Sequence, residues 1–278
     1  MKLYLALGIA SGDVTAFVGS GGKSSAILAV AGELAEAEMT FLAVPTTKML
    51  VSEAERLGSL VTAEDPEELR TKAERALSGG ATGVVVGSGL LSKNRVGGVE
   101  PAAIASLAQL ADVVLVEADG SRRRPIKGTA DHEPALPDAA TLVVAVGNIG
   151  AFGAPVDEEN VHRPELFSKL TGIEAGQSIT ARAFARALAQ GSLGDLPGGA
   201  RPAALITGVR PGKSMADASI VTRELWRFDV KKVVLSSLPD ETPGRVWLPR
   251  TPNQRKPFSS LPDVRRVALY HFHIFIIQ

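Results

Sequence analysis

The sequence predicts an α/β protein with a mostly parallel sheet and helices on both faces. Short apolar runs recur along the chain and alternate with segments of helical pattern. Several runs are continuous in Val, Ile, Leu and Ala, as in strands that are buried on both faces. A glycine-rich segment also joins the first core strand to a helix, which makes the predicted fold P-loop-like.

The expected elements follow from these patterns in chain order. Leu3, Ala6 and Leu7 fit one face of a short helix, so the apolar start is interpreted as a helix and not as a signal peptide. The helix at 66–77 has acidic residues at its start, and the helix at 101–110 begins with a proline, both favourable at a helix N-terminus. The expected strands are 14–18, 40–45, 83–86, 113–116, 141–146, 203–207 and 232–236, and the expected core helices are 24–37, 66–77, 101–110, 178–189 and 215–228.

Composition excludes several classes of function. The chain has 278 residues, 45% of them hydrophobic, and its 30 Lys and Arg balance 30 Asp and Glu. A net charge of zero predicts neither a nucleic-acid nor an anionic-membrane partner. Cysteine is absent, which excludes disulfides, thiolate metal sites and cysteine nucleophiles. With no apolar run of the roughly 20 residues that a membrane helix needs, a cytoplasmic protein is expected.

Two parts of the chain differ in character. Residues 1–238 are expected to form the nucleotide-binding α/β domain, and residues 239–278 a Pro- and Arg-rich extended tail. The aromatic and aliphatic stretch at 270–277 suits an edge strand, and equally an abnormal extension of the natural sequence.

The glycine-rich segment at 16–25 predicts a phosphate-binding loop. Its glycines let backbone N–H groups converge on an anion, and the following helix adds partial positive charge. The strict Walker A motif has a glycine where Phe17 stands, so the loop is a shortened variant. Lys23 can reach the outer phosphates, and the Ser24 hydroxyl can bind Mg²⁺. The cofactors expected are an NTP, either ATP or GTP, and Mg²⁺, with the NTP bound by Gly19, Ser20, Gly21, Gly22, Lys23, Ser24 and Ser25.

Two further loops lie after predicted strands. Glu117 and Asp119 are two residues apart and point the same way on an extended chain, so with Ser24 either can hold Mg²⁺, directly or through water. The alternative is that both carboxylates cap the edge of the sheet. Thr46, Thr47 and Lys48 can likewise contact Mg²⁺ or phosphate, although such a turn is more often structural. The residues expected to be catalytic are Lys23, Glu117, Asp119 and Arg124.

A basic loop and two histidine motifs complete the predicted site. Four cations beside two carboxylates suit a triphosphate, a developing phosphoryl charge or a small anionic second substrate; the alternative is a solvated basic turn. A histidine can serve as a metal ligand, a general base or a positioning residue. The residues expected to bind substrate are Arg122, Arg123, Lys127, His132, His162 and Arg163.

Five motifs occur in a fixed order: Gly-Ser-Gly-Gly-Lys-Ser-Ser, Thr-Thr-Lys-Met, Glu-Ala-Asp-Gly-Ser-Arg-Arg-Arg-Pro-Ile-Lys, Ala-Asp-His-Glu-Pro and Val-His-Arg-Pro-Glu. This set resembles the YqeC family of selenium-dependent hydroxylase accessory proteins over about residues 1–238. The resemblance implies an NTP-binding α/β protein in the maturation of selenium-dependent molybdenum hydroxylases, with such a hydroxylase or its cofactor as partner. Ser24 and Ser25 stand where the family more often has threonines, which preserves the hydroxyls.

Three functions are compatible with these residues. The first is Mg²⁺-dependent NTP hydrolysis, or phosphoryl or nucleotidyl transfer. The second is a non-catalytic chaperone or scaffold that uses the nucleotide as a switch for cofactor delivery. The third is a small-molecule kinase or ligase unrelated to selenium. Residues 204–209 lack the Asn-Lys-x-Asp pattern that recognises guanine, so the choice between ATP and GTP stays open.

Overall fold

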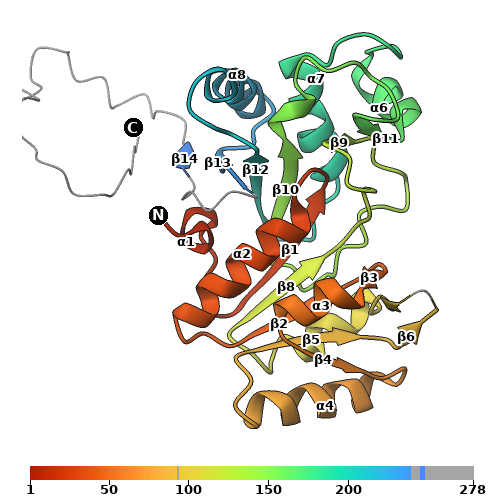
Figure 1. The fold of residues 1–278 in the computed structure, drawn as a ribbon, viewed down its shortest axis with the longest axis vertical. Helices are drawn as coiled ribbons and strands as arrows, with labels where there is room; N and C mark the ends of the chain where they lie inside the picture. Colours follow the sequence, from red (N-terminus) through yellow and green to blue (C-terminus); the bar gives the residue numbers. More distant parts are fainter. Residues whose placement is uncertain (93, 239–244, 248–278) are drawn as a thin grey trace, which may run out of the picture.

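A single large sheet forms the centre of the molecule in the computed structural model, which describes residues 1–92, 94–238 and 245–247. Its strand order is β14-β13-β12-β10-β1-β8-β2-β5-β4 (Figure 1). Eight strands run parallel, and β14 pairs antiparallel with β13. The predicted mostly parallel α/β sheet is therefore confirmed. The strands are β1 (Asp13–Gly19), β2 (Phe41–Pro45), β4 (Ser59–Thr62), β5 (Gly83–Gly87), β8 (Val113–Glu117), β10 (Leu142–Asn148), β12 (Arg201–Thr207), β13 (Lys232–Leu235) and β14 (Arg245–Trp247).

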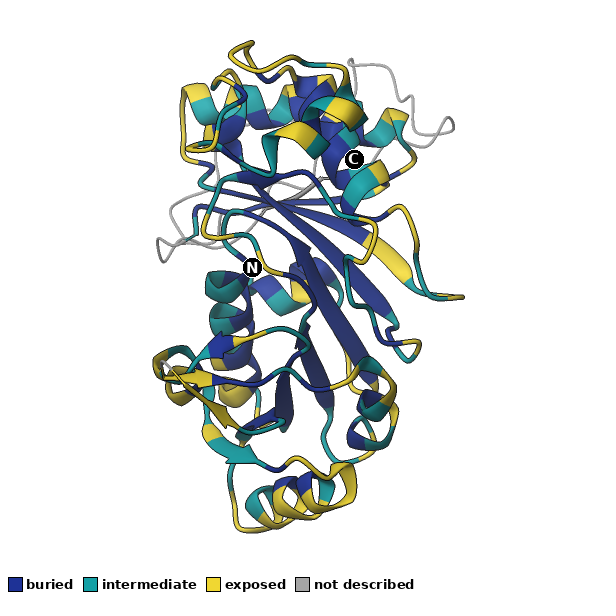
Figure 2. Cartoon of the chain, turned by 90° about the vertical axis from the view of Figure 1, so that its right-hand side faces the viewer, coloured by how far each residue is buried: buried dark blue, intermediate teal, exposed yellow. Residues whose placement is uncertain are grey.

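Helices cover both faces of this sheet, and alternate residues of β1 are buried on opposite faces. Phe17 is buried on one face together with residues of α1 and α2, whereas Ala16 and Val18 belong to the core on the opposite face. Figure 2 shows the strands as a buried layer inside the molecule. Burial on both faces explains the continuous apolar runs in the sequence. The helices are α1 (Leu3–Leu7), α2 (Lys23–Glu36), α3 (Val51–Leu57), α4 (Pro66–Ser78), α5 (Ile104–Leu107), α6 (Pro164–Thr171), α7 (Ala181–Arg186) and α8 (Lys213–Arg227).

Two predicted helices differ in the structure. The segment 101–110 is a 3-10 turn at Pro101–Ala103 followed by the single turn of α5. The segment 178–189 becomes helical only at α7, because Thr180 is its N-cap and accepts a hydrogen bond from the Ala183 N–H at 3.1 Å. That helix continues as a π-helix at Ala187–Ser192. By contrast, α4 begins at Pro66 as predicted, because Asp65 caps it through the Glu68 N–H.

Short elements that the sequence pattern did not predict lie near the carboxyl edge of the sheet. One small sheet has the order β3-β7-β6, and a second pairs β11 with β9. Like α3, β4 and α6, these elements are too short for a clear periodicity. Their bounds are β3 (Met49–Leu50), β6 (Leu90–Leu91), β7 (Arg95–Val96), β9 (Ile126–Lys127) and β11 (Val161–His162).

The predicted tail is described only at β14, which extends the main sheet instead of forming part of an isolated tail. Residues 239–244 and 248–278, including the stretch at 270–277, lie outside the described residues. Among the helices that the structure describes, none has the length and apolar character needed to cross a membrane.

Candidate functional site

The glycine loop connects the end of β1 to the start of α2 at the centre of the sheet. Gly19, Gly21 and Gly22 have positive φ angles of 88°, 74° and 129°. A Cβ atom would collide with the Val146 carbonyl oxygen at Gly19 and with the Pro125 carbonyl oxygen at Gly21, so both positions require glycine. The first N–H groups of α2 have no partner within the helix, which gives the loop the geometry of an anion cradle.

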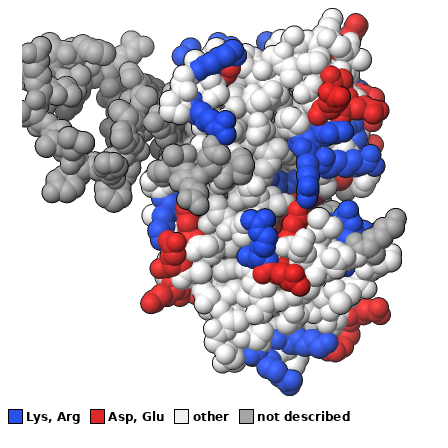
Figure 3. Space-filling view, in the orientation of Figure 1, with Lys and Arg blue, Asp and Glu red and all other residues white. Residues whose placement is uncertain are grey.

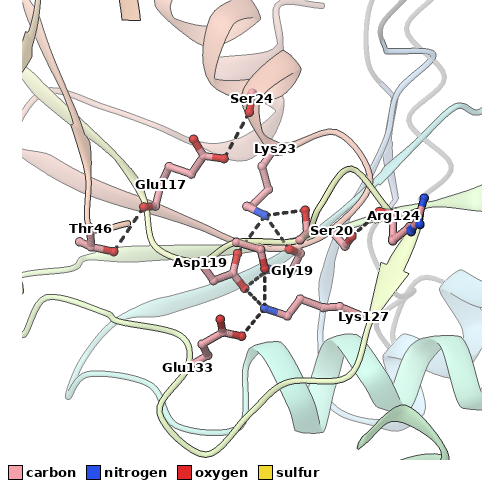
Figure 4. Close-up of polar contacts among 12 residues, drawn as sticks. Gly19, Ser20, Lys23, Ser24, Thr46, Glu117, Asp119, Arg124, Lys127 and Glu133 are labelled. Atoms are coloured by element: carbon pink, nitrogen blue, oxygen red, sulfur yellow. Dashed lines mark hydrogen bonds and ion pairs between the residues drawn. The ribbon is translucent and has the colours of Figure 1, made fainter. Parts of the chain in front are cut away.

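A buried ion cluster ties this loop to the neighbouring strand β8 (Figure 4). The Lys23 Nζ lies 2.9 Å from Asp119 Oδ1 and donates to the Gly19 carbonyl oxygen at 2.6 Å. The other Asp119 oxygen, Oδ2, accepts from the Gly19 N–H at 2.9 Å and from the Lys127 Nζ at 3.0 Å. Lys23 is only 3% exposed and Asp119 1%. Asp119 therefore holds the glycine loop through two contacts, one with the Gly19 N–H and one with the Lys23 side chain.

The cluster continues outward through Lys127. Its Nζ donates to Glu133 at 2.6 Å, and Glu133 accepts two hydrogen bonds from the Arg163 guanidinium, at 2.5 and 3.1 Å. Burial acts to raise the pKa of Glu133, but the hydrogen bonds from Arg163 and Lys127 outweigh it and lower the pKa to about 2. Glu133 is thus ionised at neutral pH, and a continuous chain of charges links Lys23 to Arg163.

The second predicted carboxylate, Glu117, has a different environment. The Ser24 hydroxyl donates to Glu117 Oε1 at 3.2 Å, which places two oxygen atoms beside the start of α2. Burial raises the pKa of Glu117, and the carboxylates of Glu53 and Asp119 add to this effect against the opposing influence of Lys23 and Ser24. Thr46 fixes the strand end, because its N–H donates to the Glu117 carbonyl oxygen at 3.0 Å. Glu117 and Asp119 both reach the first turn of α2, Glu117 at Ser24 and Asp119 at Lys23.

A polar cavity of about 830 Å³ lies beside these residues. It opens at the carboxyl ends of β2 and β8, the expected position for a site in a parallel sheet. Figure 3 shows Lys and Arg side chains gathered around a hollow on the right-hand side of the molecule. The lining residues are Ser24, Thr47, Lys48, Leu50, Glu53, Arg95, Glu117, Asp119, Gly120, Ser121, Arg122, Arg123, Arg124, Glu133, Glu158, Val161, His162, Arg163, Pro164 and Glu165.

Strand pairing brings the basic loop and the second histidine motif together. In the small sheet, His162 of β11 stands in register with Lys127 of β9. The Gly128 N–H donates to the His162 carbonyl oxygen at 2.8 Å. Burial lowers the pKa of His162, and the cations of Arg163 and Lys127 lower it further, so this imidazole is neutral at pH 7.

The sequence-predicted residues fall into two groups in space. Those that line the cavity are Ser24, Thr47, Lys48, Glu117, Asp119, Arg122, Arg123, Arg124, His162 and Arg163. The others lie elsewhere: Lys127 is buried behind Asp119, the Ser20 hydroxyl donates to the Arg124 carbonyl oxygen, and His132 is exposed outside the lining. Ser25 lies half-buried in the first turn of α2.

Several residues of the site were not predicted from the sequence. Glu133 belongs to the Asp-His-Glu-Pro motif, in which only His132 is predicted to bind substrate. Its partner Lys127 is buried in the structure and therefore needs a carboxylate, but the sequence pattern does not show this burial. Three further lining residues come from segments with no motif, namely Glu53, Arg95 and Glu158, and Glu165 ends the Val-His-Arg-Pro-Glu motif.

The comparisons with known proteins agree with the motif order. Residues 15–165, more than half of the chain, match the family model described as "YqeC protein". The chain belongs to the YqeC family. It is 29% identical over 229 residues to "Uncharacterized protein YqeC" of Escherichia coli (strain K12), an alignment that covers 81% of this chain and 87% of that protein. The span matched by the YqeC model contains all the charged residues from Lys23 to Arg163.

Replacing Glu133 by Gln should lower stability at neutral pH and flatten its acid dependence. The pKa of Glu133 is about 2 in the fold against a reference of 4.5, so its stabilisation is present above pH 4.5 and is lost as the pH falls toward 2. The expected loss at pH 7 is roughly 3 kcal/mol, measured by urea unfolding from pH 7 to pH 3. Glu165→Gln, at an exposed position, is the control; equal stability of Glu133→Gln and wild type at pH 7 would contradict the network.

Replacing Glu117 by Gln should have the opposite effect on stability. An acid with a raised pKa in the folded state destabilises the fold as the pH rises above its ordinary value, and glutamine removes this effect while keeping an acceptor for Ser24. Relative to wild type, Glu117→Gln should therefore gain stability between pH 5 and pH 8 in urea unfolding. A difference that does not change with pH would show that Glu117 has an ordinary pKa.

Proposed function

We propose that this chain is a Mg²⁺-dependent NTP-binding protein that hydrolyses the NTP or transfers its phosphoryl or nucleotidyl group. One observation carries the proposal: the glycine loop at the start of α2 is joined by a buried lysine–aspartate pair to the acidic end of the adjacent strand. Backbone N–H groups of the loop bind the phosphates, and Lys23 neutralises their charge.

The residues present fit a magnesium ion beside the phosphates. Ser24 and Glu117 supply a hydroxyl and a carboxylate 3.2 Å apart at the cavity wall, and Mg²⁺ accepts such oxygen ligands together with water and phosphate. The described part of the chain has no group of three or more His, Asp or Glu side chains that could hold a metal by itself. When bound, Mg²⁺ supplies positive charge to the phosphates.

Asp119 has a positioning role in this proposal. Its two carboxylate oxygens already contact Lys23, Lys127 and the Gly19 N–H, and it is almost completely buried. These contacts favour Glu117 over Asp119 as the carboxylate that holds the metal. Asp119 holds Lys23 close to the loop until an anion draws the lysine toward the phosphates.

The place of this activity in the cell rests on the family resemblance alone. It implies a role in the maturation of selenium-dependent molybdenum hydroxylases, with a hydroxylase or its cofactor as partner. Because the chain has no cysteine, it has no thiolate to carry selenium as a perselenide, so energy-driven activation or delivery fits its residues better.

A specific observation also favours the second candidate, a nucleotide-switched scaffold. Lys23 is linked through Asp119, Lys127 and Glu133 to Arg163 on the cavity wall. Withdrawal of Lys23 from Asp119 by a triphosphate would change the charge balance along this chain. Phosphate release without any partner protein would support an enzyme, whereas nucleotide binding without release would support the scaffold.

Replacing Lys23 by Gln should weaken nucleotide binding by about 10-fold or more, because a hydrogen bond to a charged group contributes about 1.5–3 kcal/mol. The measurement is isothermal titration with non-hydrolysable ATP and GTP analogues in the presence of Mg²⁺. Lys231→Gln, at an exposed position distant in sequence from the loop, serves as the matched charge control. A folded Lys23→Gln protein with wild-type affinity would reject the proposed role of the lysine.

A further inference from the structure

With the two buried lysines that pair with it, Lys23 and Lys127, the cavity wall has eight Lys and Arg side chains against six Asp and Glu side chains. Arg123 pairs with Glu53 at 3.5 Å, and Arg163 pairs with Glu133. The remaining four cations on the wall have no ion-pair partner among the residues that the structure describes; they are Lys48, Arg95, Arg122 and Arg124.

The carboxylates of the wall do not cancel this excess. Asp119 and Glu133 are shared among three cations, Lys23, Lys127 and Arg163, so that network has one positive charge left over. Three lining carboxylates, Glu117, Glu158 and Glu165, have no ion-pair partner in the described ranges, against four such cations. The cavity therefore attracts an anion, and more strongly one with several charges.

The backbone holds three of the lining arginines in an unfavourable conformation. Arg122, Arg123 and Arg163 have φ angles of 47°, 60° and 59°, in the left-handed region that residues with long side chains seldom adopt. Elsewhere in the described chain, only three other non-glycine residues have positive φ. Strain of this kind gathers where a side chain must be held in place for function.

The lining also limits what kind of anion fits. Among the described residues it contains no Phe, Tyr or Trp, and the apolar side chains of this described lining are only Leu50, Val161 and Pro164. A nucleobase or another aromatic group would find no stacking partner among these residues. A volume of about 830 Å³ still holds a small molecule beside the phosphate loop.

We propose that this cavity binds a second substrate, a small polar molecule with at least two negative charges and no aromatic ring, held by Lys48, Arg95, Arg122 and Arg124. Phosphorylated molecules and inorganic oxyanions share this chemistry. In the proposed function, this anion would be the acceptor of the group transferred from the nucleotide. Only that role as acceptor rests on the proposed function; the binding of the anion does not.

The test uses inorganic phosphate as the probe and the Arg95→Gln/Arg122→Gln double variant. Phosphate binding, measured by equilibrium dialysis of the full chain, should weaken at least tenfold in this variant. The control double variant Arg75→Gln/Arg182→Gln removes the same charge from two exposed positions outside the lining and should bind phosphate like the wild type. Acetate, with one negative charge, should bind at least tenfold more weakly than phosphate.

Lys23→Gln separates the cavity from the glycine loop. The proposal expects this variant to retain phosphate binding at the cavity even where nucleotide binding is lost. Phosphate binding that disappears in Lys23→Gln but survives in Arg95→Gln/Arg122→Gln would overturn the inference and leave the proposed nucleotide function intact. If Arg95→Gln/Arg122→Gln loses phosphate binding while Lys23→Gln and the control keep it, the result would support anion binding in the cavity, whether or not the chain binds a nucleotide.

If the control double variant weakens phosphate binding equally, the inference would also be overturned, because the net charge of the protein and not the cavity would then determine binding.

Discussion

The buried ion pair between Lys23 and Asp119 is the constraint on which the site depends. Both residues are almost inaccessible to water, and a buried charge is costly unless a partner and hydrogen bonds compensate it. Asp119 therefore needs Lys23, the Gly19 N–H and Lys127 in place together. This requirement fixes the glycine loop against the end of β8, so that Glu117 lies beside Ser24.

The need of each buried charge for a partner extends the site beyond the glycine loop. Lys127 is buried between Asp119 and Glu133, and Glu133 in turn holds Arg163 at the cavity wall. Parallel pairing of β9 with β11 brings these segments together, although Lys127 and His162 are far apart in sequence. The glycine loop and the cavity wall are thus parts of one charge network, which would give a physical route between a ligand at the loop and a ligand at the wall.

The sequence predicted those features that arise from local patterns. Continuous apolar runs gave the core strands because the sheet is covered on both faces, and the order of motifs gave the family. The glycine loop was predicted because its spacing and position between a strand and a helix are local properties. Glu133 and Arg95 could not be found in this way, since they reach the site only through tertiary contacts and short strands. The burial of Lys127 was missed for the same reason: a basic motif gives no sign of which cations are solvated.

The decisive measurement is a crystal structure of the protein with a non-hydrolysable NTP and Mg²⁺. We expect the triphosphate on the N–H groups at the start of α2, with Lys23 Nζ moved from Asp119 to a phosphate oxygen and the metal between Ser24 and Glu117. A triphosphate bound elsewhere, with Lys23 still against Asp119, would contradict it.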